Sequence, residues 1–575
     1  MKRSYYYMIS IIALLFLGVL CLYQPQVSPM VRAGYSEGVM AAEWDSRIAS
    51  LTNQSGISLV ADGSPWQSES PAVFMNEERQ LMVPVKALKT LFHCNAGVYE
   101  QSKLKVYRNT KTIFASLDSD TVLLSGEEYT FPSPFVQVGD EYYVSAQVIA
   151  EGLGYRFSWS DEERLLQMAD ITPLNARLPV SYDGRVYKRV PQVRDQGTLG
   201  TCWAFAAVSA LEASLLPEET WEFSIDHMSL NNFFGRSQEI GGEYTMAMSY
   251  LLAWQGPVLE SEDPYGDGKT NVMVQPRKHV QEIQIIPQKD MEGIKEAVYL
   301  YGGVQTSLYS ALTSATSVSE FYNPETAAYY YVGTEKMNHD VLIVGWDDNY
   351  PKENFNTAPE GNGAFLCLNS WGSRFGDDGY FWVSYFDSSI GIYNIVYTGV
   401  EEADNYDNIY QSDLCGWIGQ LGYGEESAYF ANAYTAKAEE TLEAVGFYAV
   451  GSNTDYEIYL VNDFNGKDDL SYENRVAQGS FSNPGYYTVR LNEAQALKAG
   501  EKFAVIIYIR TPGEERPIAV EYNNEEEHVE ADLTDGEGYI SLKGTAWQSA
   551  EENQKCNLCL KVYTKGEAEN PKTGH

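Results

Sequence analysis

The clearest helical pattern in the chain lies at residues 203–216. These residues are mostly good helix formers, and no glycine or proline interrupts them. Apolar side chains recur close to helical spacing at Ala204, Val208, Leu211 and Leu215. The pattern stops at Pro217, and Thr201 is the expected N-cap. Cys202 therefore falls in the first turn, where unpaired amides and the helix dipole favour a thiolate.

Strand-like runs alternate with short helical runs in residues 57–169. Residues 81–85 lead into a helix over 86–92, and residues 141–144 lead into a helix over 146–153. Each unit ends at a turn and is followed by another strand. This internal repeat predicts a small α/β domain of strand–helix–strand units.

The rest of the chain divides by the period of its apolar positions. Residues 178–400 mix helical and strand patterns, which predicts an α+β domain. Apolar and polar positions then alternate through residues 401–565, with turn signals between the runs, which predicts an antiparallel β-sandwich. The main strand segments expected there are residues 456–461, 486–491, 503–509 and 518–522.

Residues 1–33 have the pattern of an export signal, with Lys2 and Arg3 before a long apolar run. Residues 5–23 have a length that suits either a cleaved signal or a membrane anchor, and the sequence leaves both open. We therefore expect a secreted protein, or one attached to the extracellular surface through this segment. Three further segments are interpreted as a spacer, a linker and a tail: residues 34–56, 170–177 and 566–575.

Charge and cysteine content narrow the choice of function. The formal net charge of −39 repels nucleic acid and anionic membranes, so phosphate-binding functions are excluded. Seven cysteines in a chain of 575 residues do not indicate a disulfide scaffold. Cys556 and Cys559 have zinc-knuckle spacing, but no second pair or nearby histidine completes a site. We expect neither a metal nor a cofactor.

Two further residues complete a candidate catalytic set with Cys202. His339 stands at the entry to an apolar, β-branched strand, and Asn369 ends another apolar strand with Trp371 beside it. An asparagine oxygen can accept a hydrogen bond from one imidazole nitrogen, which orients the other nitrogen toward a thiol. Trp371 would shield that bond from water. Taken singly, Cys202 and His339 also fit inert core residues.

Together these segments resemble the papain-like cysteine peptidases. The sequence around Gln196 and Cys202 is similar to the nucleophile motif of that family, and the segments at His339 and Asn369 are similar to its histidine and asparagine motifs. The resemblance covers residues 178–400. It implies two lobes, one helical with Cys202 and one β-rich with His339 and Asn369, and a cleft between them that binds protein or peptide substrates.

The resemblance also implies a role for each residue. Cys202 would be the thiolate nucleophile, paired with His339 as an ion pair, and Asn369 would orient the imidazole. Gln196 and the backbone N–H of Cys202 would stabilise the oxyanion. The residues expected on the substrate side are Gly241, Gly242 and Trp371.

The sequence differs from the usual pattern of that family in its flanking domains and in one cysteine position. Leu199 stands where the family usually has a cysteine of a disulfide, so that bridge is absent. Residues 57–169 resemble a copper-amine-oxidase-N-like stalk module in place of the usual propeptide. Residues 401–565 resemble a lectin-like domain, which leaves a carbohydrate or cell-surface ligand open. A thiol-dependent transpeptidase or amidase, or an adhesin with a peptidase scaffold, stays as an alternative.

Overall fold

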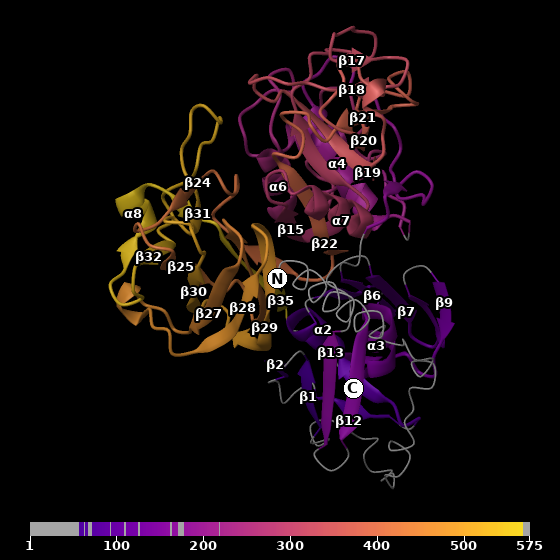
Figure 1. Ribbon diagram of the computed structural model, residues 1–575. Helices are drawn as coiled ribbons and strands as arrows, with labels where there is room; N and C mark the ends of the chain where they lie inside the picture. The colour runs from indigo at the N-terminus through magenta and orange to yellow at the C-terminus, as the bar shows by residue number, and fades with distance from the viewer. Residues whose placement is uncertain are drawn as a thin grey trace, which may run out of the picture. The chain divides into compact units, whose positions relative to one another are not determined.

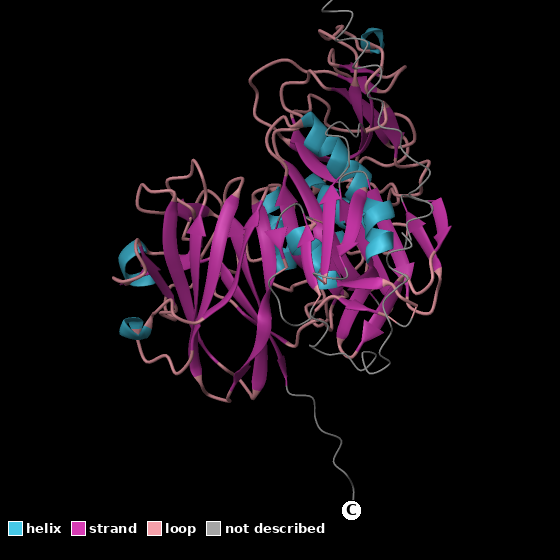
Figure 2. Ribbon diagram, turned by 60° about the horizontal axis from the view of Figure 1, so that its bottom comes forward, coloured by secondary structure: helices cyan, strands magenta, loops and turns pink. Residues whose placement is uncertain are grey.

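The computed structural model describes residues 57–566, except residues 62–63, 67–71, 77, 93, 100, 109–110, 125–126, 161–163, 171–177 and 218. The expected signal or anchor (1–33) and spacer (34–56) lie outside the described residues, as do nearly all of the expected linker and tail. The chain divides into two compact units, Met1–Ala176 and Arg177–His575. Strands make up most of the regular structure (Figure 2).

Two strand–helix–strand repeats organise the first unit, and their two helices are labelled in Figure 1. The repeats are β4 (Leu81–Pro84), α2 (Val85–Leu91) and β5 (Asn95–Tyr99), and β11 (Glu141–Ser145), α3 (Ala146–Leu153) and β12 (Tyr155–Ser160). They meet because β4 and β11 pair antiparallel. The Ser145 side chain caps α3, and Gly154 ends it at φ 78°, a left-handed conformation that suits glycine. The predicted repeat is confirmed.

The remaining strands of this unit complete its three sheets. Residues 103–130 form consecutive antiparallel hairpins that extend from β5. The strands are β1 (Ser58–Ala61), β2 (Ser64–Pro65), β3 (Phe74–Met75), β6 (Lys103–Arg108), β7 (Lys111–Ser116), β8 (Thr121–Leu124), β9 (Glu127–Thr130), β10 (Phe135–Val138) and β13 (Leu165–Asp170).

Helices gather in the first half of the second unit. The longest is α4 (Cys202–Leu215), which starts and ends one residue earlier than predicted. It is buried on most of its faces because alanines let neighbouring elements approach closely, and its apolar side chains share one core with α5 and α6. The other helices here are α5 (Ile225–Leu230), α6 (Tyr244–Leu252) and α7 (Met291–Tyr301), and Asp290 caps α7.

A long sheet packs beside α4 and carries the second half of this domain. Its neighbouring strands run in the order β17, β18, β21, β20, β19, β16, β22, β15, and β14 pairs with β19. The bounds are β14 (Ser181–Asp183), β15 (Lys278–Ile285), β16 (Val304–Leu308), β17 (Tyr322–Asn323), β18 (Ala328–Tyr329), β19 (His339–Asp347), β20 (Ala364–Leu368), β21 (Tyr380–Ser384) and β22 (Asn394–Glu402), with a 3₁₀ turn η4 (Lys352–Asn354). A helical part and a β-rich part are both present, as predicted.

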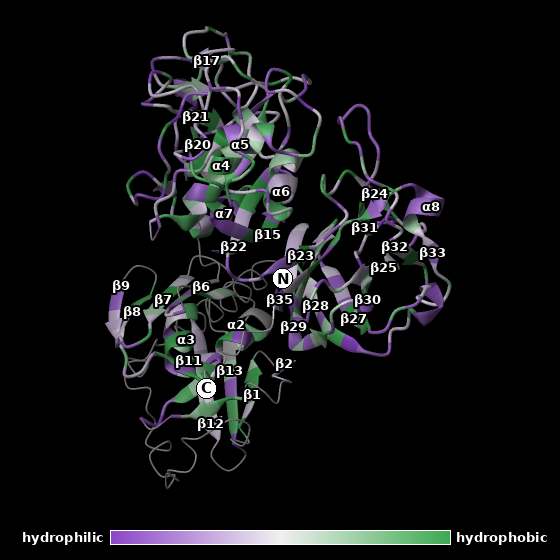
Figure 3. Cartoon of the chain, turned by 180° about the vertical axis from the view of Figure 1, so that it is seen from behind, coloured by the Kyte–Doolittle hydropathy of each residue, from purple (hydrophilic) through white to green (hydrophobic). Residues whose placement is uncertain are grey.

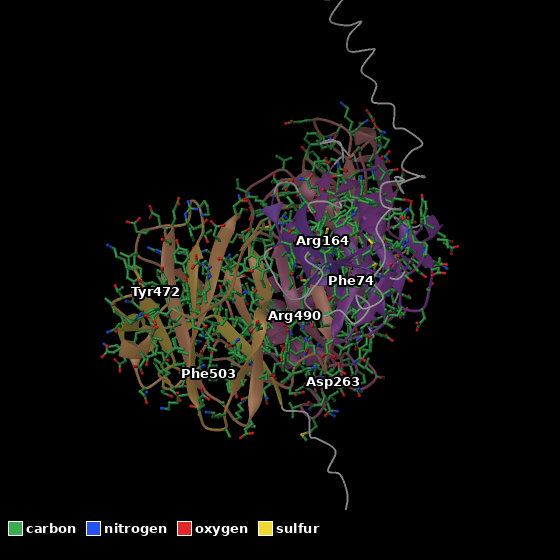
Figure 4. All side chains as sticks on the ribbon, turned by 90° about the horizontal axis from the view of Figure 1, so that it is seen from below. Phe74, Arg164, Asp263, Tyr472, Arg490 and Phe503 are labelled. Atoms are coloured by element: carbon green, nitrogen blue, oxygen red, sulfur yellow. The ribbon has the colours of Figure 1, made fainter. Side chains whose placement is uncertain are left out.

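The C-terminal domain is built from antiparallel strands that form opposed layers around an apolar core. Phe503, labelled in Figure 4, is fully buried in that core. Its elements are β23 (Asn408–Tyr410), β24 (Gly419–Leu421), β25 (Ser427–Thr435), β26 (Glu440–Ala449), β27 (Thr454–Val461), η5 (Lys467–Asp469), β28 (Arg475–Phe481), β29 (Gly485–Leu497), β30 (Lys502–Arg510), β31 (Ile518–Glu521), β32 (Gly538–Ser541), β33 (Gln548–Ser549), α8 (Ala550–Gln554), β34 (Asn557–Leu558) and β35 (Leu560–Gly566). The four predicted strand segments are confirmed.

The long sheet of residues 178–400 continues into the C-terminal domain. Strand β15 pairs with β29 through residues 282–284 and 485–487, and the sheet continues through β26, β35 and β23. Lys278, at the start of β15, is 2% exposed and forms ion pairs with Glu219 at 2.6 Å and with Glu402. Main-chain hydrogen bonds therefore join residues 178–400 to the C-terminal domain.

Side chains strengthen the same junction. The His279 ring stacks on Trp254 with centroids 3.7 Å apart, and its Nδ1 lies 2.6 Å from Oδ1 of Asn405. Arg490, labelled in Figure 4, forms an ion pair of 2.9 Å with Glu401. Apolar residues concentrate in the strands and helices, whereas the connecting loops are mostly hydrophilic (Figure 3).

None of the described helices is long and apolar enough to cross a membrane. The segment expected to be a signal or anchor, residues 5–23, lies outside the described residues.

Candidate active site

Cys202 lies at the first position of α4, as the sequence predicts. The preceding turn uses Gly197 at φ 63°, a conformation that favours glycine. Thr201 occupies the N-cap position, but the prediction that its side chain caps the helix is wrong. Its hydroxyl instead lies 2.7 Å from the Tyr265 hydroxyl. The Thr201 side chain therefore leaves the first turn of α4 uncapped, and the backbone N–H groups of Cys202 and Trp203 can act on a thiolate or an oxyanion.

The base and its orienting partner come from two neighbouring strands. His339 begins β19, and Asn369 directly follows β20, which pairs antiparallel with β19. Nε2 of His339 donates to Oδ1 of Asn369 at 2.8 Å, and this oxygen also accepts from the N–H of Ser370. A donating Nε2 leaves Nδ1 as the nitrogen that can take a proton from a thiol.

Trp371 covers the imidazole. The rings of His339 and Trp371 stack with centroids 4.7 Å apart and an interplanar angle of 28°. Trp371 is 8% exposed and also contacts Phe375 edge-on. Trp371 therefore stacks on the ring that donates to Asn369, and little of its own surface is exposed.

The thiol reaches the same strand as the imidazole. Cys202 accepts hydrogen bonds from the backbone N–H groups of Trp203 and Asp340, and Asp340 is the residue after His339. The nucleophile and the base are therefore brought together by the contact between α4 and β19.

Gln196 is held from both ends of its side chain. Its Nε2 donates to the carbonyl of Leu199 at 2.7 Å, and its Oε1 accepts from the Ser370 hydroxyl at 2.6 Å. The Tyr265 hydroxyl donates to its backbone carbonyl at 2.9 Å. An amide nitrogen carries two hydrogens, so Nε2 keeps one for a further acceptor. This arrangement suits an oxyanion donor.

Burial dominates the electrostatics of the two central groups. It raises the pKa of the Cys202 thiol to about 12, helped by the Asp340 charge. It lowers the pKa of the His339 imidazole to about 4, although the hydrogen bond that His339 donates to Asn369 acts in the opposite direction. Each shift alone favours the neutral form, contrary to the expected resting ion pair. A thiolate and an imidazolium formed together attract each other, so proton transfer within the pair costs less than two separate ionisations.

Gly241 and Gly242 lie against the catalytic helix. A Cβ on Gly242 would stand 2.6 Å from Nε1 of Trp203, and Gly241 has φ 90°. Gly242 is expected on the substrate side of the cleft, where a side chain would block the approach of a substrate backbone. The structure supplies a packing reason as well, because the Trp203 ring occupies the space of a side chain.

Three contributors to the site were missed by the sequence analysis. Ser370 and Tyr265 hold Gln196, and Asp340 supplies an N–H to the thiol. Ser370 had a weak signal, since it adjoins Asn369, whereas the contacts of Tyr265 and Asp340 depend on distant segments. Among the described residues, no group of three or more histidine, cysteine or acidic side chains is placed to hold a metal ion.

Three known families match the chain in order. Residues 60–168 match the copper amine oxidase N-terminal domain, residues 178–400 match the papain family of cysteine proteases, and residues 409–564 match a lectin-like domain. Cathepsin S of Bos taurus is 33% identical over 214 residues, which are 36% of this chain and 60% of cathepsin S. Cathepsin K of Gallus gallus is 30% identical over 214 residues, 36% of this chain and 59% of that protein. The chain thus spans about 60% of the length of these relatives.

Solved structures match both domains of the second unit at once. The clostridial cysteine protease Cwp84 after propeptide cleavage matches with a TM-score of 0.61 and 28% identity, over 67% of this chain and 99% of that one. A crystal structure of the cysteine protease and lectin-like domains of Cwp84, a surface layer associated protein of Clostridium difficile, matches with a TM-score of 0.59 and 27% identity, over 68% and 89%. This chain therefore carries a papain-family cysteine protease domain, preceded by a copper amine oxidase N-terminal domain and followed by a lectin-like domain.

Proposed function

We propose that this protein is an exported cysteine endopeptidase that hydrolyses peptide bonds with Cys202, His339, Asn369 and Gln196. The observation that carries the proposal is the hydrogen bond of 2.8 Å from His339 Nε2 to Asn369. This bond directs Nδ1 of His339 away from Asn369. The next residue on the same strand, Asp340, contacts the Cys202 thiol. A scaffold without catalysis has no need of this orientation.

Acylation begins with proton transfer from Cys202 to His339. The thiolate attacks the carbonyl carbon of the scissile peptide bond, and the carbonyl oxygen becomes an oxyanion. The second hydrogen of Gln196 Nε2 and the N–H of Cys202 stabilise that charge. The imidazolium of His339 then protonates the leaving amine, and a thioester to Cys202 remains.

Deacylation reverses the roles of the same groups. His339 takes a proton from a water molecule, which attacks the thioester, and the second tetrahedral species uses the same two donors. Collapse releases the carboxylic acid and returns the proton to the Cys202 sulfur. Asn369 holds the imidazole in one orientation through both steps.

Export is the second part of the proposal. It rests on the signal-like pattern of residues 1–33 and on the likeness of the two C-terminal domains to Cwp84, which is described as surface layer associated. Protein substrates on or near a cell surface follow from that location. A carbohydrate ligand of the lectin-like domain and anchoring through residues 5–23 belong to the same proposal.

Labelling with an epoxide inhibitor of cysteine peptidases tests the catalytic assignment. The folded protein should gain one inhibitor mass on Cys202, and peptide hydrolysis should stop in proportion to labelling. Cys202→Ala should neither label nor cleave. Cys94→Ala, which removes a buried thiol from the other unit, should still be labelled at Cys202 and should still cleave the peptide. A folded wild-type protein without label at Cys202 would overturn the proposal.

The products decide between hydrolysis and acyl transfer. Incubation with a peptide substrate and a large excess of an added amine should yield mainly the free acid. A product in which the amine carries the acyl group would instead identify a transpeptidase.

A further inference from the structure

Asp340 is a buried acid beside the catalytic pair that the proposed mechanism does not use. It follows His339 on β19 and is 8% exposed. Its Oδ2 accepts from Nε2 of Gln305 at 3.1 Å, and the Ser307 side chain, which stands opposite it on β16, also donates to it. Both donors are neutral.

No cationic side chain in the described part of the chain forms an ion pair with this carboxyl group. Arg194 is paired with Glu212 of α4 instead. The charged neighbour that acts on Asp340 is another acid, Glu243. A buried carboxylate without a cation keeps a desolvation cost that neutral donors offset only in part.

The acid lies within reach of the reacting centre. The N–H of Asp340 donates to the Cys202 sulfur. Gln305 Nε2 bridges Asp340 Oδ2 and the carbonyl of Trp203, the residue after the nucleophile, at 3.1 and 3.3 Å. A ligand group bound at Asp340 is therefore adjacent to the bond that Cys202 attacks.

Asp340 lies near aromatic and acidic side chains that are partly exposed. Its charge acts on Tyr244, the first residue of α6, and Tyr244 follows Gly241, Gly242 and the exposed Glu243. The Tyr244 ring lies 5.4 Å from Tyr393, which is 41% exposed. Aromatic faces beside carboxylates suit the methylene stem and charged end of lysine or arginine.

We propose that Asp340 selects peptides that place a lysine or arginine side chain next to the scissile bond. This inference rests on the proposed peptidase function and names the substrate class of the same cleft. The aliphatic stem packs along Tyr244 and Tyr393, and the cationic end pairs with Asp340, with Glu243 nearer the solvent.

Such a substrate also assists catalysis. The negative charge of Asp340 opposes formation of the Cys202 thiolate. A substrate cation that pairs with Asp340 offsets this charge when the thiolate must form. Binding of the preferred side chain thus favours acylation as well as affinity, so the preference should appear in kcat as well as in KM.

Matched peptides measure the preference. A positional library identifies the position at which a basic residue is favoured, and two substrates that differ there only as arginine and citrulline then isolate the charge. The ratio of their kcat/KM values should exceed about ten in the wild type and fall at least about ten-fold in Asp340→Asn. Glu335→Gln, which removes an exposed acid of the same domain, should keep the wild-type ratio. Equal ratios in wild type and Asp340→Asn overturn the inference.

A pH series on the wild type tests the inference without relying on a folded variant. Burial, with a smaller contribution from Glu243, raises the pKa of Asp340 to about 6, and arginine and citrulline do not titrate near that value. The arginine-to-citrulline ratio should therefore fall as the pH is lowered through about 6. The titratable groups near Asp340 include His339, which precedes it on β19, and also Glu243, Tyr244, Tyr397 and Cys202. A ratio that is flat from pH 8 to pH 5 contradicts the inference.

Epoxide labelling separates this inference from the proposed function. Labelled, active enzyme without a preference for basic side chains overturns the role of Asp340 alone. The absence of both labelling and cleavage overturns the peptidase assignment itself.

Discussion

Ser370 and Gln196 form a hydrogen bond of 2.6 Å between residues that are far apart in the chain. Ser370 directly follows Asn369 in the sequence, and Gln196 precedes the catalytic helix. The backbone N–H of Gln196 also donates to the Ser370 carbonyl at 2.8 Å. The group that orients the base and the proposed oxyanion donor are thus fixed to each other.

Removal of this hydroxyl tests whether the position of Gln196 matters for catalysis. Ser370→Ala frees Oε1, so the amide can rotate and its donor hydrogen loses the required direction. We expect kcat to fall about ten-fold with little change in KM, less than the 10²- to 10³-fold loss typical of deleting an oxyanion donor. Steady-state kinetics of Gln196→Ala gives the larger reference value, and Gln288→Ala, an exposed glutamine, gives the control. A KM effect without a kcat effect would contradict the assignment.

Asn369→Ala should slow acylation while the fold is kept. Without Oδ1, the imidazole of His339 can turn, and the N–H of Ser370 loses its acceptor as well. We expect the rate of acylation in a stopped-flow burst to fall about 10- to 100-fold. Asn362→Ala, an exposed asparagine in the same domain, should retain wild-type acylation. Unchanged acylation in Asn369→Ala would show that another group orients the imidazole.

The pH dependence of kcat/KM follows from the opposite shifts of the central pair. Burial raises the pKa of Cys202 to about 12 and lowers that of His339 to about 4, so the pair holds one proton throughout the neutral range. For a substrate without ionisable side chains, kcat/KM should rise through an acid limb, hold a broad plateau and fall on the alkaline side. A rate that only increases toward the pKa of a free thiol would indicate an unpaired cysteine.

Stability should respond to pH through buried carboxyl groups. Burial raises the pKa of Glu521 from 4.5 to about 7, where it accepts hydrogen bonds from Cys415 and Asn557. Between those values the folded state holds a proton that the unfolded state has released, so this group's contribution to stability falls as pH rises from about 4.5 to 7. Glu521→Gln removes that dependence.

Thermal unfolding measures the effect as a difference between variants. Relative to the wild type, Glu521→Gln should be more stable at pH 8 than at pH 5 by about 1–3 kcal/mol. The exposed Glu525→Gln should show no such change. A constant difference between wild type and Glu521→Gln at the two pH values would show that Glu521 ionises normally in the folded protein.

The positions of Cys202, His339 and Asn369 could be predicted from sequence because each sits at the end of a strongly patterned element. A helix start and two strand ends expose side chains at the edges of their elements, where they can meet. The error at Thr201 has a physical reason. A nearby phenol offered a better partner than the backbone, and Tyr265 is distant in sequence.

The buried position of Asp340 could not be predicted in the same way. An acid after the histidine fits a half-exposed strand position, and only the pairing of β19 with β16 places it beneath Gln305 and Ser307. The pairing of β15 with β29 was equally hidden. Both strands have an ordinary alternating pattern, and nothing in either segment specifies a partner about 200 residues away.

The main-chain hydrogen bonds between β15 and β29 fix the position of the active site relative to the C-terminal domain. A flexible tether would let the cleft sample many bonds around any anchoring point. Here the two domains share a sheet and a buried lysine with two acidic partners, so the distance from the lectin-like domain to Cys202 is fixed. If the C-terminal domain holds a substrate protein, as proposed, the cleft would reach only the bonds at that one distance, and the geometry of attachment would be a second source of selectivity.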